Sequence, residues 1–175
     1  MLINLSELFD SDGKEKTWTA EPGMDVFEAP NGAYPVLRKS PVELTIRSLG
    51  GRKFRMWGEA SLTLSIPCDR CLEPVECPFD LAIDEEFEVN GTDAERGTDP
   101  DAQHYVDGYI LDVDQLLRNE LLLSLPMKVL CREDCRGICN QCGMNLNTGT
   151  CSCEQSSPDP RMAAVQDIFQ KFKEV

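Results

Sequence analysis

Closely spaced cysteines constrain this chain more than any other feature of its sequence. Six of its nine cysteines fall between Cys131 and Cys153, and Cys68 and Cys71 form a Cys-Asp-Arg-Cys pair upstream. Paired cysteines two or three residues apart can turn two thiolates toward one point, and a tetrahedral zinc site needs two such pairs. The sequence therefore predicts structural zinc.

Eight of the cysteines divide into two predicted four-thiolate zinc sites. The local site contains Cys139, Cys142, Cys151 and Cys153, and the long-range site contains Cys68, Cys71, Cys131 and Cys135. The alternative is a single zinc held by the downstream segment, with the upstream pair left as free thiols. Cys77 shares the alternation of the apolar residues around it, so we expect it to be buried and not to bind metal.

A disulfide framework and a catalytic zinc are the competing interpretations of these cysteines. Disulfides are typical of small secreted domains, whereas the first residues here lack the basic start and apolar run of a signal peptide. Catalytic zinc sites usually include histidine or carboxylate and leave one position open. The only histidine, His104, lies outside the cysteine-rich segment. We therefore expect reduced cysteines and structural zinc.

Charge is unevenly distributed along the chain, whose net charge is −14. Residues 84–114 include eleven acidic residues and one basic residue, whereas residues 38–70 include seven basic and three acidic residues. The overall charge argues against a nonspecific nucleic-acid binder, but the basic segment permits one limited contact with phosphate. The candidate nucleic-acid-binding residues are Arg47, Arg52, Lys53, Arg55 and Arg70.

Long segments alternate apolar and polar residues with the period of a β-strand. Residues 42–46 alternate in this way, a Gly-Gly hairpin signal follows, and the alternation continues over 54–66 and 75–89. Gly58 in the second of these strands predicts a β-bulge. The pattern indicates an antiparallel meander whose second turn carries the upstream cysteine pair.

Helices are predicted at three places. Residues 6–9 form one turn, Asp112 caps a second helix, and an apolar stripe predicts a C-terminal helix over 158–174. Glycine and proline predict that 14–41 is mostly irregular, with strand pieces around Trp18 and Val36, and 90–103 is expected to be an acidic loop.

Together these elements predict an α+β fold with an antiparallel meander or partly closed sheet, two or three helices and a small cysteine-rich zinc-binding lobe. The length and the apolar content of 41% suit one compact domain over 1–175. The zinc-binding lobe spans 131–153 within it. No apolar stretch is long enough to span a membrane.

The order of these motifs resembles one known family. The shared features are Cys68-Asp-Arg-Cys71-Leu72 after a long strand, Gly108 to Asp112 before a helix with Glu120, Leu125-Pro126, and the Cys131–Cys153 run followed by Asp-Pro-Arg. They resemble the YceD family, bacterial and plastid proteins linked to accumulation of large-subunit (23S) ribosomal RNA. Asn140 departs from the proline that many members carry there, and many relatives lack the distal cysteines.

The resemblance implies a cytoplasmic role in ribosome biogenesis, in which the partner is a precursor of the large ribosomal subunit. The contact could be 23S rRNA, a basic ribosomal protein, or both. No nucleophile–base pair, phosphate-binding loop or carboxylate pair is evident in the sequence, so we expect no enzyme activity and no small-molecule substrate.

Two mechanisms stay open within the family. One is an assembly factor that contacts RNA through the basic segment and the zinc lobe. The other is an acidic chaperone that shields a basic ribosomal protein without touching RNA. A redox-responsive zinc protein is a third interpretation, outside the family.

Overall fold

The computed structural model describes residues 1–9, 12–89, 105–153, 162 and 165. The chain forms two compact units, one made of Met1–Pro67 with Pro74–Val129 and the other of Cys68–Glu73 with Leu130–Val175. The helix predicted over 158–174 lies outside the described residues apart from Met162 and Val165. A single domain over 1–175 with a lobe at 131–153 stays a prediction.

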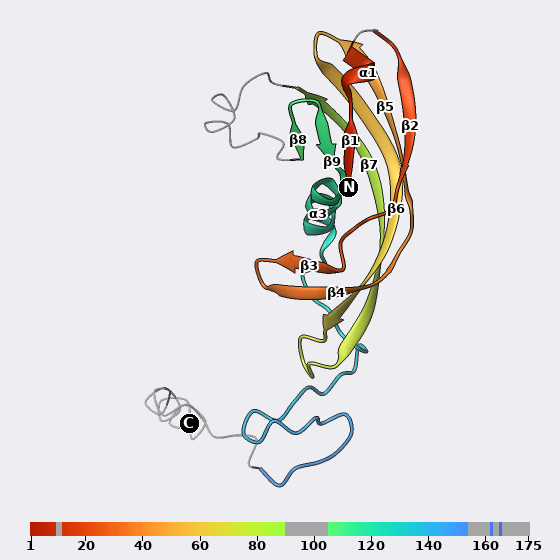
Figure 1. The fold of residues 1–175 in the computed structure, drawn as a ribbon. Coiled ribbons are helices and arrows are strands. Elements are labelled where there is room, and N and C mark those ends of the chain that lie inside the picture. Colours follow the sequence, from red (N-terminus) through yellow and green to blue (C-terminus); the bar gives the residue numbers. More distant parts are fainter. Residues whose placement is uncertain (10–11, 90–104, 154–161, 163–164, 166–175) are drawn as a thin grey trace. The chain divides into compact units, whose positions relative to one another are not determined.

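Six antiparallel strands build the main sheet of the first unit (Figure 1). They are β2 (Glu15–Ala20), β3 (Val26–Ala29), β4 (Gly32–Lys39), β5 (Val42–Gly50), β6 (Lys53–Pro67) and β7 (Pro74–Glu88). Strand β6 is central, because β5 and β4 pair with successive parts of one edge and β7 pairs with the whole of the other. Strands β2 and β3 extend the sheet beyond β5 and β4, and the sheet does not close on itself.

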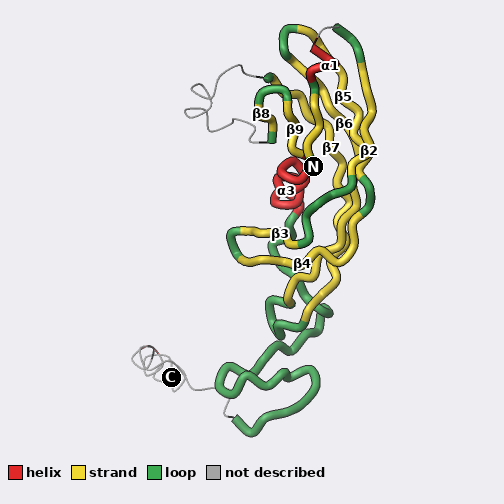
Figure 2. Tube along the Cα trace, in the orientation of Figure 1, coloured by secondary structure: helices red, strands yellow, loops and turns green. Residues whose placement is uncertain are grey.

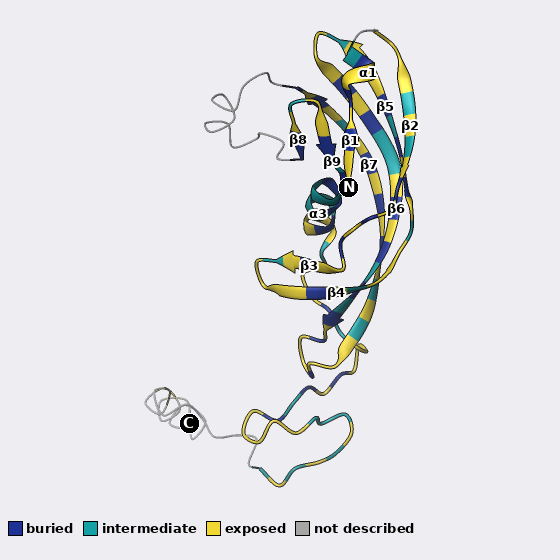
Figure 3. Cartoon of the chain, in the orientation of Figure 1, coloured by how far each residue is buried: buried dark blue, intermediate teal, exposed yellow. Residues whose placement is uncertain are grey.

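The predicted alternation is present along the two longest strands. Figure 3 shows buried and exposed residues following one another along β6 and β7. Cross-strand partners point to the same face of a sheet, so the unbroken β6–β7 register sorts the apolar side chains onto one face. Its buried members include Phe54, Met56, Leu62, Leu64, Leu81 and Ile83.

A small sheet and helix α3 (Val113–Ser124) contribute the other half of this core (Figure 2). The small sheet contains β1 (Leu2–Asn4), β8 (Val106–Asp107) and β9 (Ile110–Asp112), in the order β1-β9-β8. The short helix α1 (Ser6–Phe9) follows β1. Asp112 caps α3 as predicted, since its carboxylate accepts hydrogen bonds from the N–H groups of Asp114 and Gln115.

The predicted α+β class is confirmed, with two helices among the described residues. The expectation that residues 14–41 are mostly irregular is wrong, because β2, β3 and β4 lie there. Six residues of β2 pair with β5, so their backbone hydrogen bonds come from a partner distant in sequence. No helix in the described part of the chain is long and apolar enough to cross a membrane.

The expectation of a β-bulge at Gly58 is also wrong. Gly58 pairs in regular register with Leu44, and the register shifts of the sheet fall elsewhere, between Ser48 and Gly50 and between Val36 and Arg38. A glycine stands at this position because the backbone of the neighbouring strand β5 approaches it too closely to leave room for a side chain.

Candidate metal centres

The structure gathers eight cysteines into two groups that could each hold a metal ion. The first centre contains Cys68, Cys71, Cys131 and Cys135, and the second centre contains Cys139, Cys142, Cys151 and Cys153. Within each group all four sulfur atoms lie within 4.8 Å of one another. This is the grouping predicted from the cysteine spacing, and both centres belong to the second compact unit.

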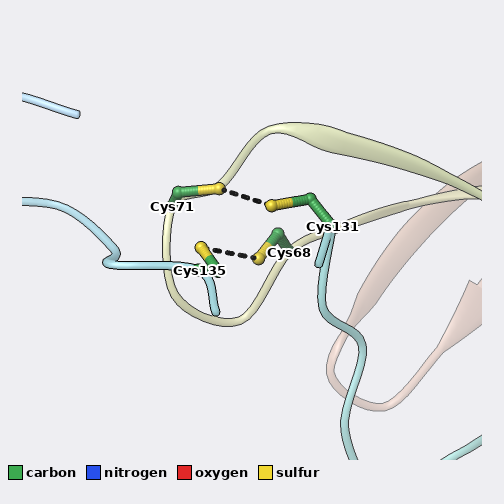
Figure 4. Close-up of side chains that lie close together, drawn as sticks. All are labelled: Cys68, Cys71, Cys131 and Cys135. Carbon is green, nitrogen blue, oxygen red and sulfur yellow. Dashed lines mark hydrogen bonds between the residues drawn. The ribbon is translucent and has the colours of Figure 1, made fainter. Parts of the chain in front are cut away.

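The four thiols of the first centre point toward one another (Figure 4). The Sγ atoms of Cys68 and Cys135 are 3.8 Å apart, and those of Cys71 and Cys131 are 3.5 Å apart. These separations far exceed the bond of about 2.05 Å in a disulfide, and all four thiols are free. They match the edge of about 3.8 Å that four sulfurs form at about 2.3 Å from one tetrahedral zinc. The donor set therefore fits a metal ion.

The turn between β6 and β7 presents the first two thiols of this centre. The Leu72 N–H donates to the Cys68 carbonyl at 2.9 Å, and Leu72 has a positive φ of 64°. Arg70 joins this turn to the downstream segment: its Nη1 donates to the Cys135 carbonyl at 2.8 Å, and its own carbonyl accepts from the Ile138 N–H at 3.1 Å. Backbone contacts thus bring together two segments that are distant in sequence.

The thiols of the first centre differ in how readily they ionise. Burial raises the pKa of Cys68, but hydrogen bonds from backbone N–H groups, led by that of Arg70, outweigh burial and lower this pKa to about 6. Burial, followed by the neighbouring Cys71 thiol, raises the pKa of Cys131 to about 12. Cys68 therefore ionises readily, whereas ionisation of Cys131 would add a second negative charge nearby and is disfavoured. A bound dication would stabilise both thiolates.

A tight loop builds the second centre in the same way. The Cys139 N–H donates to the Met144 carbonyl at 2.8 Å, and the Gly143 N–H donates to the Cys139 carbonyl at 2.9 Å. Backbone N–H groups, led by that of Cys142, lower the pKa of Cys139 to about 6. The adjacent Cys142 thiol raises the pKa of Cys153 to about 12. Both centres therefore favour binding of a cation by thiolates.

Asn147 links the two centres, although it lies in the loop of the second. Its Nδ2 donates to the Cys135 sulfur of the first centre at 3.3 Å and to Asn145 Oδ1 at 2.9 Å. Its Oδ1 accepts from the Arg136 N–H at 2.8 Å, which fixes the orientation of the amide. A hydrogen bond to a thiolate orients a metal ligand and stabilises its negative charge.

Replacement of Asn147 by alanine should weaken metal binding at the first centre about 10–100-fold, the range typical of lost partners of metal ligands. Competition between the protein and a coloured zinc chelator would measure the change. Thr150→Ala is the matched control, because Thr150 is an exposed residue of the same loop. Equal affinities for the two variants would show that the Asn147 hydrogen bond has no effect on the first centre.

Two of the predicted nucleic-acid-binding residues form ion pairs across the outer face of the main sheet. Arg47 Nε lies 2.9 Å from Glu15 Oε2, and its guanidinium carbon lies 5.4 Å from the centre of the Trp57 ring. Arg55 donates through Nε and Nη2, each at 3.0 Å, to the two oxygens of Asp84. The hydrogen bond from Arg55 lowers the pKa of that carboxyl. These cations already have anionic partners.

The other three predicted residues differ in exposure and in partners. Arg70 is engaged with the Cys135 carbonyl. Arg52 in the β5–β6 turn and Lys53 at the start of β6 are exposed, and neither forms an ion pair with any residue that the structure describes. The surface free to meet phosphate is therefore smaller than the sequence predicts.

Cys77 points to the apolar face of β7, as its position in the sequence predicts. It is half-buried, packs against the core and belongs to neither metal centre. Burial raises the pKa of its thiol.

Sequence reasoning missed Glu85, which occupies an inward position on β7 between Ile83 and Phe87. The Tyr105 hydroxyl donates a hydrogen bond to the Glu85 carboxylate. Burial, followed by the charge of Glu85, raises the pKa of Glu120 on α3. The available signal was the single acidic residue that interrupts the apolar alternation of 75–89.

Replacement of Glu120 by glutamine should stabilise the first unit at neutral pH, with a gain that shrinks as the pH falls toward about 4. The raised pKa means that the folded protein favours the protonated acid. Glu120 therefore contributes its full share of folding stability below the pKa of the unfolded chain, and this share is lost as the pH rises through the pKa of the folded protein. Urea unfolding at several pH values would measure this, with the exposed Glu88→Gln as control. A gain independent of pH would contradict the assignment.

Comparison with known proteins places these features in a family context. The chain is 28% identical over 110 residues to the uncharacterized protein YlbN of Bacillus subtilis, covering 62% of each chain. It is 34% identical over 102 residues to the uncharacterized protein Rv2926c of Mycobacterium tuberculosis, covering 58% of this chain and 49% of the relative.

A plant relative matches over more of the chain. The Arabidopsis thaliana protein named large ribosomal RNA subunit accumulation protein YCED homolog 1, chloroplastic, is 25% identical over 180 residues, covering 86% of this chain and 53% of the relative. The chain thus spans about half to three fifths of the length of these relatives. No solved structure matches.

Residues 56–169 match the family described as large ribosomal RNA subunit accumulation protein YceD. This span is more than half of the chain and contains all eight cysteines of the two centres. The chain therefore belongs to the YceD family.

Proposed function

We propose that this protein is a non-enzymatic ribosome-biogenesis factor that supports accumulation of 23S rRNA by binding an assembling large ribosomal subunit in the cytoplasm. The observation that carries the proposal is the family match over residues 56–169, which includes most of the long β6–β7 hairpin and both metal centres. The name of the plant relative supports the same role.

We further propose that each centre holds one structural zinc ion. Four thiolates suit zinc in tetrahedral geometry and leave no coordination position for a substrate or an activated water. The first centre joins the β6–β7 turn to the segment that starts at Cys131. Zinc would therefore stabilise the second unit and would not take part in a reaction.

Charge favours a ribosomal protein over RNA as the direct contact. Arg47 and Arg55, which the sequence offers to phosphate, are paired with Glu15 and Asp84. Desolvating and breaking such pairs would offset part of what a phosphate contact contributes. An acidic chaperone-like contact with a basic protein does not require these ion pairs to break.

Depletion of the protein in its native host tests the role, because we expect 23S rRNA to fall relative to small-subunit rRNA and to recover with the wild-type chain. Unchanged rRNA would end the proposal. Capture from lysate with and without ribonuclease tests the contact. Partners that survive ribonuclease support protein binding, whereas complete loss would favour RNA.

A charge-reversed variant separates the two contacts further. The variant R52E/K53E replaces two exposed basic side chains of the β5–β6 hairpin, neither of which has an ion pair in the described part of the chain. A phosphate contact predicts weaker particle binding with a flatter salt dependence. Unchanged particle binding would remove RNA contact by this turn and leave the protein contact.

A further inference from the structure

Strand β7 forms a long edge of the main sheet. All fifteen of its residues, from Pro74 to Glu88, pair with β6 in one unbroken register. Within the described ranges, no strand pairs with its other edge (Figure 1). An exposed edge of this length is a template for pairing with another chain, and natural sheets usually block such edges.

The hydrogen-bonding direction of β7 follows from the bonds at its two ends. The Val89 N–H donates to the Arg52 carbonyl at 3.0 Å, and the Cys68 N–H donates to the Glu73 carbonyl at 2.8 Å. Hydrogen-bonded pairs alternate with non-bonded pairs in an antiparallel ladder. Odd-numbered residues of β7 therefore bond to β6, and even-numbered residues direct their N–H and C=O groups toward the free edge.

The prolines of β7 agree with this direction. Pro74 and Pro78 both occupy even-numbered positions, where the missing N–H would point away from β6. Proline is tolerated in a sheet only where no ladder hydrogen bond is lost. These prolines block one end of the edge, whereas no proline interrupts residues 80–88.

The open part of the edge carries a column of acidic side chains. Its even-numbered residues include Asp80, Ala82, Asp84 and Glu88, all exposed, and Asp84 is paired with Arg55 of β6. The strand contains no lysine or arginine. Backbone groups of Asp80, Ala82 and Asp84 make no hydrogen bond to another element in the described part of the chain. The column would repel an acidic strand or a phosphate and would attract a basic strand.

We propose that residues 80–88 of β7 bind an extended segment of a basic protein, which adds to the sheet as a further strand. Backbone hydrogen bonds supply the affinity, and lysine or arginine at alternate positions of the segment pairs with the acidic column. The proposal rests on the proposed function, because it assigns the ribosomal-protein contact to one edge of the sheet.

A peptide that alternates lysine with threonine is the probe, and NMR-detected amide exchange in the full-length, metal-loaded chain is the readout. The peptide should protect the amides of Asp80, Ala82 and Asp84, which lack ladder partners, while those of Leu81 and Ile83 are protected with or without it. The same peptide with N-methyl groups on alternate amides should not bind. Protection elsewhere, or binding of the N-methylated peptide, would overturn the proposal.

Ala82→Pro removes one edge-directed N–H and should weaken peptide binding about tenfold or more. The fold should tolerate it, since Pro74 and Pro78 share its parity. Ala82→Ser keeps the N–H and is the matched control. The variant D80K/E88K keeps the backbone intact, and it should also lose binding. Unchanged binding in both variants would contradict strand addition.

Complementation separates failure of this inference from failure of the proposed function. If depletion lowers 23S rRNA and the wild-type chain restores it, the proposed function stands. Ala82→Pro should then restore it less well than Ala82→Ser. Full restoration by Ala82→Pro would reject the edge-binding inference and leave the role in rRNA accumulation intact.

Discussion

Replacement of Cys135 by serine should lower bound zinc from two ions per chain to one, because it removes a buried ligand of one of the two centres. Binding of structural zinc contributes on the order of 10–16 kcal/mol in small zinc-dependent folds, so the loss should also loosen the second unit. Metal analysis of protein prepared without added zinc would give the stoichiometry. Limited proteolysis would report new cleavage in Cys68–Glu73 or after Leu130, the segments of the second unit.

The long-range ligands explain why this loss should be large. The first centre joins the turn at Cys68 and Cys71 to Cys131 and Cys135. Closing such a chain segment costs entropy, and the free energy of metal binding to the folded state offsets that cost. Without the fourth thiolate, the remaining three repel one another when ionised.

Cys77→Ala is the control for this experiment, because Cys77 lies on β7 outside both centres. It should leave zinc unchanged and destabilise the first unit by about 1 kcal/mol, as a small truncation beside the core. A wild-type stoichiometry near one that Cys135→Ser does not alter would leave a single zinc site in the downstream segment.

The elements predicted best from sequence were those governed by local periodicity or spacing. Alternation alone located the β5–β6–β7 meander, since a strand with one buried face repeats every two residues. Spacing divided the eight cysteines into four pairs and left a single-site alternative open, and the structure joins the upstream pair to Cys131 and Cys135. The start of α3 was also predicted from local sequence, because Asp112 is a residue type that caps helix N-termini.

The features that were missed depend on partners distant in sequence. The sequence indicated only strand pieces around Trp18 and Val36, and the full lengths of β2 and β4 depend on the backbone groups that β5 and β6 offer them. The pairing of Arg55 with Asp84 depends on the β6–β7 register, so the sequence alone left this arginine available for phosphate. Register is fixed by the whole sheet and not by any one strand.

Gly58 gives the second large expected effect. Substitution of Gly58 by alanine should destabilise the first unit by about 3–4 kcal/mol, near the upper end for single substitutions. A Cβ at this position would lie 2.2 Å from the Glu43 carbonyl oxygen and 3.2 Å from the Leu44 Cα. Both contacts are with backbone, so no rotation of a side chain can relieve them. Strand β5 would have to move away from β6 and lose part of the ladder.

Urea unfolding followed by the fluorescence of Trp18 and Trp57, which lie on β2 and β6 in the same unit, would measure this loss. Gly51→Ala is the matched control, because a Cβ there meets nothing within 4 Å and only the positive φ of 62° opposes it. That backbone conformation costs a non-glycine residue about 1–2 kcal/mol. If Gly58→Ala costs no more than Gly51→Ala, the two strands can separate without losing their pairing, and close approach does not explain the glycine.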